Sequence, residues 1–231
     1  MINSDFPHKK YLFKNTNIFE KISDKVYSLL EENKIVVKLK KGQVLFYEGT
    51  IPNGVYILKK GRAKKYSKGI NDKEYIFHLL KENDILGHHD ILCNEAYSHS
   101  VACLTDCLFY LIPKNIFLFI LKNNPFILDN LLKSISREFG VFVNNSRVLA
   151  QHNVRERTAL SLIKLNYFFE DDQEIILSRK DHSNIIGTSI ESLIRVLHDF
   201  KEEGIVEVRE SKIIIKDAQK LAEIFNPHCG V

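Results

Sequence analysis

The sequence predicts an α+β protein in which a β sandwich or barrel, a long helix and a helix-turn-helix unit with a β-hairpin follow one another. Three patterns predict this order. Short β-type runs separated by turn residues fill positions 35–112, apolar residues recur every seven positions between 128 and 149, and two short helical patterns flank a glycine turn between 178 and 204. With 231 residues, the chain can form two domains that each bury most of their apolar surface.

Residues 1–125 are expected to form the β domain. An amphipathic helix over 17–32 precedes its first strand. Gly42, Gly49, Gly54 and Gly61 fall where strands reverse, and turns often need the positive φ that glycine adopts readily. Seven short strands at this spacing are typical of a sandwich or barrel. The expected strands are 35–38, 44–47, 55–58, 63–66, 75–80, 100–103 and 108–112.

Residues 126–150 are expected to form a dimerisation helix and hinge. An apolar stripe sustained over three heptads suits a helix that pairs with a second copy of itself. The alternative is a helix that packs only on its own domain, and Gly140 inside the pattern could bend it. The stripe consists of Leu128, Ile135, Phe142 and Leu149, seven residues apart, widened by Leu132 and Phe139.

Residues 151–231 are expected to form a DNA-binding domain. A helix over 158–169 and a strand over 174–177 come first. Ser178 and Asp181 fit a capping box at the start of a short helix, which ends at Gly187. A second helix over 189–203 stops at Gly204, and strands 205–208 and 213–215 form a hairpin. This is the spacing of a helix-turn-helix.

The composition is that of a folded protein outside the membrane. Hydrophobic residues make up 45% of the chain and charged residues 27%, which excludes a disordered or fibrous protein. Residues 1–10 lack the apolar core of a signal peptide, and no run reaches membrane-spanning length. We therefore expect a cytoplasmic protein with reduced thiols. Its cysteines, which form no CxxC pair, are Cys93, Cys103, Cys107 and Cys229.

Two motifs resemble those of one regulator family. The segment LKKGQVLFYEG at 39–49, with VYIL at 55–58 and Lys60-Gly61, resembles the opening of a cyclic-nucleotide-binding β-roll. The segment GTSIESLIRVL at 187–197 resembles the recognition helix of Crp/Fnr transcription regulators. The resemblance covers nearly the whole chain in the family's order. It implies a double-stranded β-helix (a jelly-roll-like β-roll), a long dimerisation helix and a C-terminal winged helix-turn-helix, in a sequence-specific, dimeric DNA-binding regulator.

The helix-turn-helix supplies the candidate DNA contacts. In the second helix, Leu193, Ile194, Leu197 and Phe200 are expected to be buried, which leaves the N-terminal polar residues facing outward, where they can enter a major groove. The preceding helix is expected to touch phosphates, and Arg209 and Lys212 to flank the tip of the wing. The candidate DNA-binding residues are Arg179, Lys180, Ser189, Ile190, Glu191, Ser192 and Arg195.

Individual roles follow from side-chain chemistry. Arg195 could bind guanine or a phosphate, and Glu191 could accept a hydrogen bond from cytosine. The resemblance gives this glutamate and arginine base-contacting roles. Alternatively, Glu191 forms a capping box with Thr188 and needs no DNA. Ile190 stands where some family members carry an arginine, so contact with a thymine methyl group could replace one hydrogen-bonded contact.

The expected partners are a near-palindromic DNA duplex and a second copy of the chain, and contact with RNA polymerase is left open. The charge balance opposes DNA binding, because residues 150–231 contain 11 Lys and Arg against 14 Asp and Glu. A sensor or protein-interaction module that does not bind DNA is therefore the alternative. No P-loop, HExxH or GxSxG motif indicates an enzyme.

The β-roll is not expected to bind cyclic AMP in the family's usual way. The resemblance implies a glutamate after a glycine to hold the ribose, and an arginine about ten residues later for the phosphate. Here His88 follows Gly87, Tyr97 stands near the arginine position, and no Lys or Arg occurs between Lys81 and Lys114. The effector is unknown, and Lys64 or Lys65 could reach in from a neighbouring strand. The candidate pocket residues are Gly87, His88, Tyr97, Ser98 and His99.

A cluster of histidines and a cysteine lies in the same segment. These side chains, with an aspartate, are ones that a metal ion or a haem could use, but they lack an accepted zinc spacing. We assign no metal ligand, and we leave the question of a metal or haem open. The cluster comprises His88, His89, Asp90, Cys93 and His99.

Overall fold

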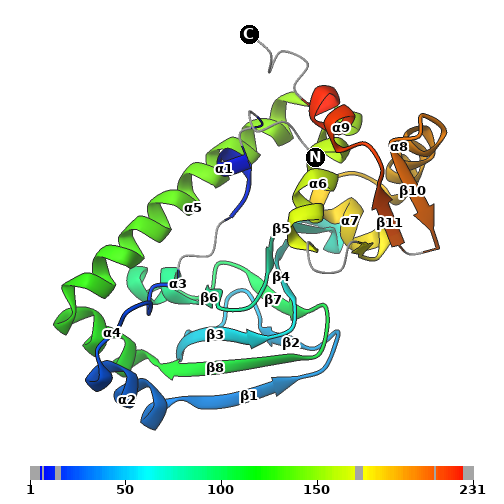
Figure 1. Cartoon of the computed structure of the whole chain (residues 1–231). Helices are drawn as coiled ribbons and strands as arrows, with labels where there is room; N and C mark the ends of the chain where they lie inside the picture. Colours follow the sequence, from blue (N-terminus) through cyan, green and yellow to red (C-terminus); the bar gives the residue numbers. More distant parts are fainter. Residues whose placement is uncertain (1–5, 7, 14–16, 170–173, 211, 226–231) are drawn as a thin grey trace. The chain divides into compact units, whose positions relative to one another are not determined.

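The computed structural model describes residues 6, 8–13, 17–169, 174–210 and 212–225 (Figure 1). The chain forms two compact units. One consists of Lys14–Glu138, and the other combines Met1–Phe13 with Phe139–Val231. The expected α+β class is confirmed, as is the order of β-roll, long helix and C-terminal winged helix-turn-helix. Cys229 lies outside the described residues.

Two four-stranded sheets make up the β-roll. Their strand orders, β1-β8-β3-β6 and β2-β7-β4-β5, are those of a jelly roll, and the paired strands run antiparallel. Side chains from both sheets meet between them, including Leu58, Leu80, Val101 and Phe109. The strands are β1 (Ile35–Leu39), β2 (Val44–Phe46), β3 (Gly54–Lys60), β4 (Ala63–Lys68), β5 (Glu74–Leu80), β6 (Ile85–Leu86), β7 (Ser100–Cys103) and β8 (Cys107–Pro113).

Seven of these strands lie where the sequence predicts them. The two-residue strand β6 is too short to give a recognisable pattern, and it was not predicted. The expected helix over 17–32 is also shorter than predicted: α2 spans Asp24–Asn33, because Ser23 caps it by accepting a hydrogen bond from the Val26 N–H. Ile18 lies in the turn before α2 and is nevertheless buried.

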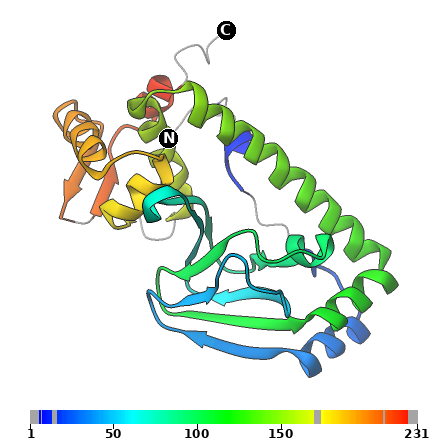
Figure 2. The same ribbon diagram turned by 180° about the vertical axis from the view of Figure 1, so that it is seen from behind.

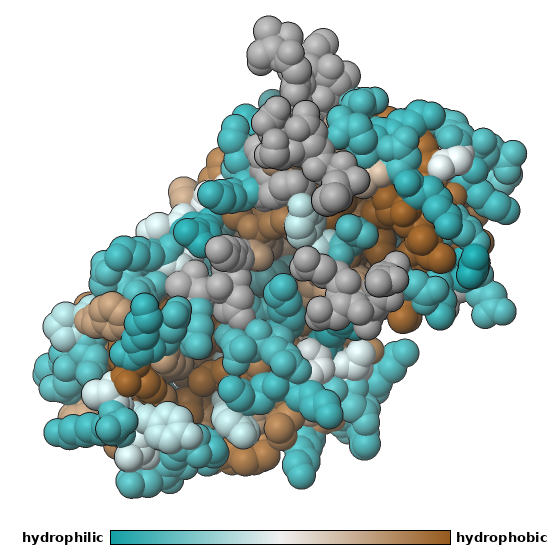
Figure 3. Space-filling view, viewed as in Figure 1, coloured by the Kyte–Doolittle hydropathy of each residue, from teal (hydrophilic) through white to brown (hydrophobic). Residues whose placement is uncertain are grey.

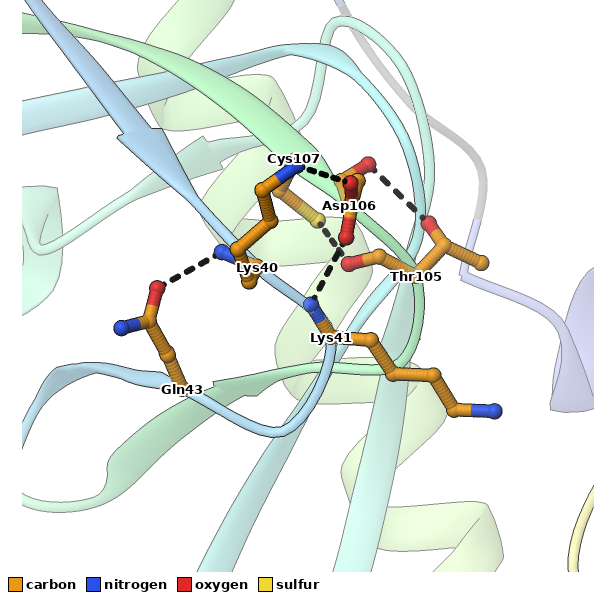
Figure 4. Close-up of polar contacts among 6 residues, drawn as sticks. All are labelled: Lys40, Lys41, Gln43, Thr105, Asp106 and Cys107. Carbon is orange, nitrogen blue, oxygen red and sulfur yellow. Dashed lines mark hydrogen bonds and ion pairs between the residues drawn. The ribbon is translucent and has the colours of Figure 1, made fainter.

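One turn of the β-roll illustrates how its motif residues act (Figure 4). Asp106, between β7 and β8, accepts hydrogen bonds from Lys40 Nζ at 2.8 Å and from the Lys41 N–H at 3.0 Å. Gln43 Oε1 accepts from the Lys40 N–H at 2.7 Å. Gly42 has a φ of +85°, and its N–H donates to Cys103 O. The β1–β2 turn is therefore fixed to the β7–β8 turn.

The long helix α5 spans Pro125–Gln151 and is continuous through Gly140. In the first unit, its buried face packs Ile127 and Leu131 into a core with Phe117 and Ile120 of α4 (Lys114–Asn123). The remaining short helices are α1 (His8–Tyr11), the 3-10 helix η1 (Ile70–Asp72) and α3 (His88–Cys93).

Within its described residues, the C-terminal region contains four helices and a three-stranded sheet of order β10-β11-β9. Figure 2 shows the same ribbon from behind. Helix α6 begins four residues earlier than predicted, because Asn153 and Glu156 form a capping box. The last helix was not predicted. Its Phe225 ring contacts the Tyr11 ring edge to face, with 5.2 Å between the ring centroids. The elements are α6 (Val154–Phe168), β9 (Ile175–Ile176), α7 (Arg179–Ile186), α8 (Ile190–Glu202), β10 (Val206–Arg209), β11 (Lys212–Ile215) and α9 (Ala218–Phe225).

Most of the surface in Figure 3 is hydrophilic, and apolar side chains reach it in several places. Large exposed hydrophobic residues include Tyr27, Ile35 and Phe139. None of the described helices combines the length and the apolar character that crossing a membrane would require.

Candidate DNA interface and effector pocket

Two side-chain caps and a glycine position the recognition helix α8. Ser178 Oγ accepts a hydrogen bond from the Asp181 N–H at 3.0 Å and so begins α7. Gly187, with a φ of +71°, ends α7 in the left-handed conformation that glycine favours. Ser189 Oγ then accepts from the Ser192 N–H at 3.1 Å and begins α8. The predicted helix-turn-helix geometry is therefore built by local hydrogen bonds.

The proposed capping box between Thr188 and Glu191 is wrong, because Ser189 is the N-cap residue. Glu191 instead receives hydrogen bonds from its own N–H and from the Ser189 hydroxyl, and these hold the pKa of its carboxyl below the usual value. The carboxylate remains fully exposed at the start of α8. It is available to a ligand, although Ser189 competes for it.

The outward face of α8 is broader than predicted. Ser189, Ile190, Glu191 and Arg195 are exposed, and Ser192 is half-buried. Ile194 was expected in the buried stripe but is 52% exposed. A helix places residues four positions apart on one face, so Ile194 shares the face of Ile190 rather than that of the buried Leu193, Leu197 and Phe200. The four-residue spacing of the two isoleucines was the signal that could have revealed this.

The Arg179 side chain is half-buried and hydrogen-bonded within the protein, whereas the neighbouring Lys180 side chain is exposed to solvent. Arg179 Nη2 donates a hydrogen bond to the carbonyl oxygen of Glu210 at 3.1 Å, which ties the start of α7 to the β10–β11 turn. Burial lowers the pKa of this guanidinium. Arg179 therefore supports the wing, whereas Lys180 is exposed and has no ion-pair partner among the described residues.

The cations of the wing are paired with acidic side chains. Arg209 forms an ion pair with Glu207. Lys216 also pairs with Glu207, at 2.7 Å, and Lys212 pairs with Glu174 at 2.7 Å. The positive rim expected from Arg209 and Lys212 is thus partly neutralised within the protein.

A bidentate ion pair anchors the C-terminal end of α8. Arg155 Nη2 lies 2.7 and 2.8 Å from the two carboxylate oxygens of Glu203, and the guanidinium carbon lies over the Phe200 ring, 4.7 Å from its centroid.

On the buried side of α7, the ring Nε2 of His182 lies 3.1 Å from Ser161 Oγ. Burial lowers the pKa of His182 to about 3, so this histidine is neutral.

The predicted effector-pocket residues lie together in the β-roll, but Tyr97 fills the space beside Gly87. A Cβ atom at Gly87 would lie 3.1 Å from Tyr97 Cε1 and 3.2 Å from Gly54 O. The Tyr97 ring stacks on Phe46, with 3.7 Å between the ring centroids, and is buried. Burial raises the pKa of its hydroxyl above the usual value.

The two predicted histidines and Ser98 lie close to Asp90. The Ser98 N–H donates to Asp90 Oδ1 at 2.9 Å, and Ser98 Oγ lies 3.1 Å from His99 Nδ1. Burial, and then the charge of Lys65, lower the pKa of His88 to about 3 and that of His99 to about 4. The described residues contain no group of three His, Cys, Asp or Glu side chains that could hold a metal ion.

The predicted stripe of α5 is largely exposed. Phe139 is 70% exposed, and Leu132 is also well exposed. Ile135 is half-buried against the core of the unit Lys14–Glu138. The Phe142 ring contacts the Phe13 ring edge to face, with 5.1 Å between the ring centroids. The exposed members of the stripe are Leu128, Leu132, Phe139, Phe142 and Leu149, with Val143 beside them.

Comparison with known proteins identifies two domains. Residues 36–124 match the cyclic nucleotide-binding domain, and residues 156–224 match the Crp-like helix-turn-helix domain. The chain is 23% identical over 186 residues to the cyclic AMP receptor protein of Thermus thermophilus, covering 80% of this chain and 85% of that protein. It is 25% identical over 207 residues to the anaerobic regulatory protein of Haemophilus influenzae, covering 87% and 79%. The solved structure of FixK2 from Bradyrhizobium japonicum has a similar fold, with a TM-score of 0.75, 15% identity and coverage of 83% of this chain and 96% of that one.

Proposed function

This chain belongs to the Crp/Fnr superfamily of transcription regulators, and we propose that it binds a near-palindromic DNA site as a homodimer. The observation that carries the proposal is the exposed, capped N-terminal end of α8. Ser189, Glu191 and Arg195 are all exposed there, and a helix N-terminus with polar side chains can enter the major groove. The domain boundaries near residues 125 and 150 remain part of this proposal.

We assign different tasks to the residues of this face. Arg195 is the candidate for bidentate contact with guanine, and Glu191 for contact with the amino group of cytosine. Ile190 and Ile194 are placed to contact thymine methyl groups, since both are exposed and lie one turn apart. Lys180 is the candidate phosphate contact. Arg179 acts indirectly, by holding the wing through Glu210.

The exposed stripe of α5 supports the homodimer. Large apolar side chains that repeat at heptad spacing on an otherwise polar helix face are the pattern by which two helices pair. A two-fold axis along this helix would present two recognition helices to half-sites about 34 Å apart, one turn of DNA. RNA polymerase is a further proposed partner of the DNA-bound dimer.

The β-roll is proposed to sense something other than cyclic AMP. In the position after Gly87 stands a buried, neutral histidine rather than a carboxylate that could hold a ribose. Tyr97 lies against Gly87 and occupies the space beside it. The candidate pocket segment 82–113 supplies no lysine or arginine of its own for a cyclic phosphate.

Selection from a randomised duplex library tests the proposal. The protein should enrich a two-fold symmetric sequence, and its affinity for that sequence should exceed its affinity for random DNA by about 10³-fold or more. Binding should weaken steeply as the salt concentration rises. A protein that shifts no duplex at low salt would instead be the sensor or interaction module that the acidic balance of residues 150–231 suggests.

A further inference from the structure

The N-terminal segment packs on the C-terminal unit of the chain. Residues 1–13 group with residues 139–231, whereas Lys14 begins the other unit. We call the described part of this segment, residues 6 and 8–13, the strap. Figures 1 and 2 both show its helix α1 beside the C-terminal part of α5. Phe6 is 7% exposed and Tyr11 is 5% exposed, so the strap buries two aromatic rings and is a packed part of this unit.

The strap is anchored by an aromatic cluster. The Phe225 ring of α9 lies 6.2 Å from the Phe6 ring and 5.2 Å from the Tyr11 ring, measured between centroids. The Phe225 ring also stacks on the His152 ring at 4.9 Å, and His152 follows directly after α5. Aromatic rings attract one another at these distances. Phe6 and Tyr11 are therefore held against the last helix, beside the connection between α5 and α6.

The last residue of the strap lies on the apolar stripe of α5. Phe13 follows Tyr11 by two residues, and its ring contacts the Phe142 ring edge to face, with 5.1 Å between the centroids. Phe142 is one of the stripe residues that recur every seven positions. In a pair of helices, the residues of such a repeat insert between side chains of the facing helix. Phe13 therefore lies against a side chain that a second copy of α5 would contact.

The exposed fractions along α5 agree with this contact. Phe139 and Val143, which flank Phe142 on the helix, are 70% and 53% exposed, but Phe142 is only 36% exposed. Phe13 is itself half-buried. Side chains in a packed interface interdigitate without overlapping, so the surface of Phe142 that Phe13 covers is closed to the side chains of a second α5. The strap thus covers part of the stripe.

We propose that the strap is an autoinhibitory contact, in which Phe13 takes a place on Phe142 that the α5 helix of a second copy needs. Dimerisation then requires Phe13 to move aside, while Phe6 and Tyr11 remain anchored. Because Tyr11 holds Phe13 close to Phe142, the effective concentration of the Phe13 ring far exceeds that of a second chain in solution. This inference rests on the homodimer proposed above.

The strap would set the protein concentration at which DNA binding begins. A palindromic site needs two recognition helices, so only the dimer binds it with full affinity. A contact that stabilises the monomer alone lowers the dimer fraction, and this effect disappears once the protein concentration is far above the dimer dissociation constant. A strap that stabilised monomer and dimer equally would not change the concentration at which the dimer forms.

Phe13→Ser and Phe119→Ser form a matched pair of variants. Each removes one phenylalanine ring, but Phe119 is a 55% exposed residue of α4 outside the stripe. Sedimentation equilibrium of the full-length protein should give Phe13→Ser a dimer dissociation constant at least about tenfold lower than that of the parent, and Phe119→Ser the parent value. Phe13→Leu keeps an apolar side chain and should lie between Phe13→Ser and the parent, and it replaces Phe13→Ser if that variant unfolds. Below the dimer dissociation constant of the parent, Phe13→Ser should also bind the selected DNA more tightly.

A Phe13→Ser dimer no tighter than the parent dimer would disprove the autoinhibitory contact, and a weaker dimer would show that Phe13 belongs to the interface. In either case the homodimer itself stands. If the parent and both Phe13 variants remain monomeric at every concentration, the homodimer is disproved, and the autoinhibitory contact with it. Enrichment of a two-fold symmetric DNA sequence, measured separately, decides the regulator function.

Discussion

Leu149 at the end of α5 lies directly against Gly187 in the turn of the helix-turn-helix, where an added Cβ atom would come within 3.0 Å of Leu149 Cδ1. Gly187 also has a φ of +71°, and its N–H donates to Ser183 O at 2.9 Å. The helix that carries the apolar stripe therefore also braces the turn that aims α8. This end of α5 is therefore in direct contact with the helix-turn-helix.

Gly187→Ala should destabilise the protein more than Gly204→Ala. Both glycines have a φ of +71°, so each substitution should cost about 1 kcal/mol for the left-handed conformation. Only Gly187 has a neighbour close to the added methyl group, while Gly204 has nothing within 4 Å. Urea unfolding measures both costs. Equal losses in the two variants would show that Leu149 does not constrain the turn.

Phe139→Asp should convert the dimer into a monomer at micromolar concentration. A charge at the most exposed aromatic position of the stripe would be buried without a partner in a helix pair. Arg137→Asp changes the charge by more, but Arg137 lies two residues away and so on the other side of the helix. That control should remain dimeric. Sedimentation velocity distinguishes the two, and a Phe139→Asp dimer as stable as the parent would exclude this stripe as the interface.

Arg195→Ala and Lys180→Ala should affect DNA binding differently. Loss of Arg195 should cost about 1–3 kcal/mol on the selected site and relax the preference at one base pair per half-site. Loss of Lys180 should weaken binding to specific and random DNA alike and reduce the salt dependence. Fluorescence anisotropy at several salt concentrations separates these effects. If Arg195→Ala weakens both DNA types equally, Arg195 is a phosphate contact instead.

Cyclic AMP and cyclic GMP should not bind the β-roll tightly. A buried phosphate would need the cation that residues 82–113 lack, and a ribose beside Gly87 would collide with Tyr97. Calorimetric titration of the purified protein with each nucleotide measures this. A dissociation constant of about 10 μM or below, about −7 kcal/mol, would contradict the prediction.

Stability should fall as the pH drops below about 6.5. Folding lowers the pKa of His88 and His182 to about 3 and that of His99 to about 4, so between these values and about 6.5 the unfolded chain binds more protons. Each histidine can contribute up to about 1.4 kcal/mol per pH unit. Burial raises the pKa of Asp84 to about 6, so between about pH 4 and pH 6 the folded chain binds more protons at this residue than the unfolded chain does. Asp84 alone would therefore make stability rise as the pH drops through this range. Urea unfolding at pH 7 and pH 5 tests the net effect. His182→Gln should flatten the dependence, and an unchanged slope in that variant would contradict the assignment to His182.

The sequence by itself determined the order of the elements and the helix-turn-helix. Gly187 between two capped helices and the short strands separated by turn residues are local patterns, whose physical basis lies within a few residues. The long stripe of α5 was likewise readable, because heptad spacing on one helix needs no knowledge of the rest of the fold.

Only the tertiary structure decided which side chains are buried or bound to distant partners. Lys65 stands in a run of polar and aromatic residues, and its burial depends on which face of β4 meets the opposite sheet. Ile194 looks like a core residue until the orientation of α8 is known. Arg179 donates a hydrogen bond to the carbonyl oxygen of Glu210, thirty-one residues further along the chain. Composition and spacing set local conformation, but burial and long-range pairing arise from the packing of whole elements, which no single segment encodes.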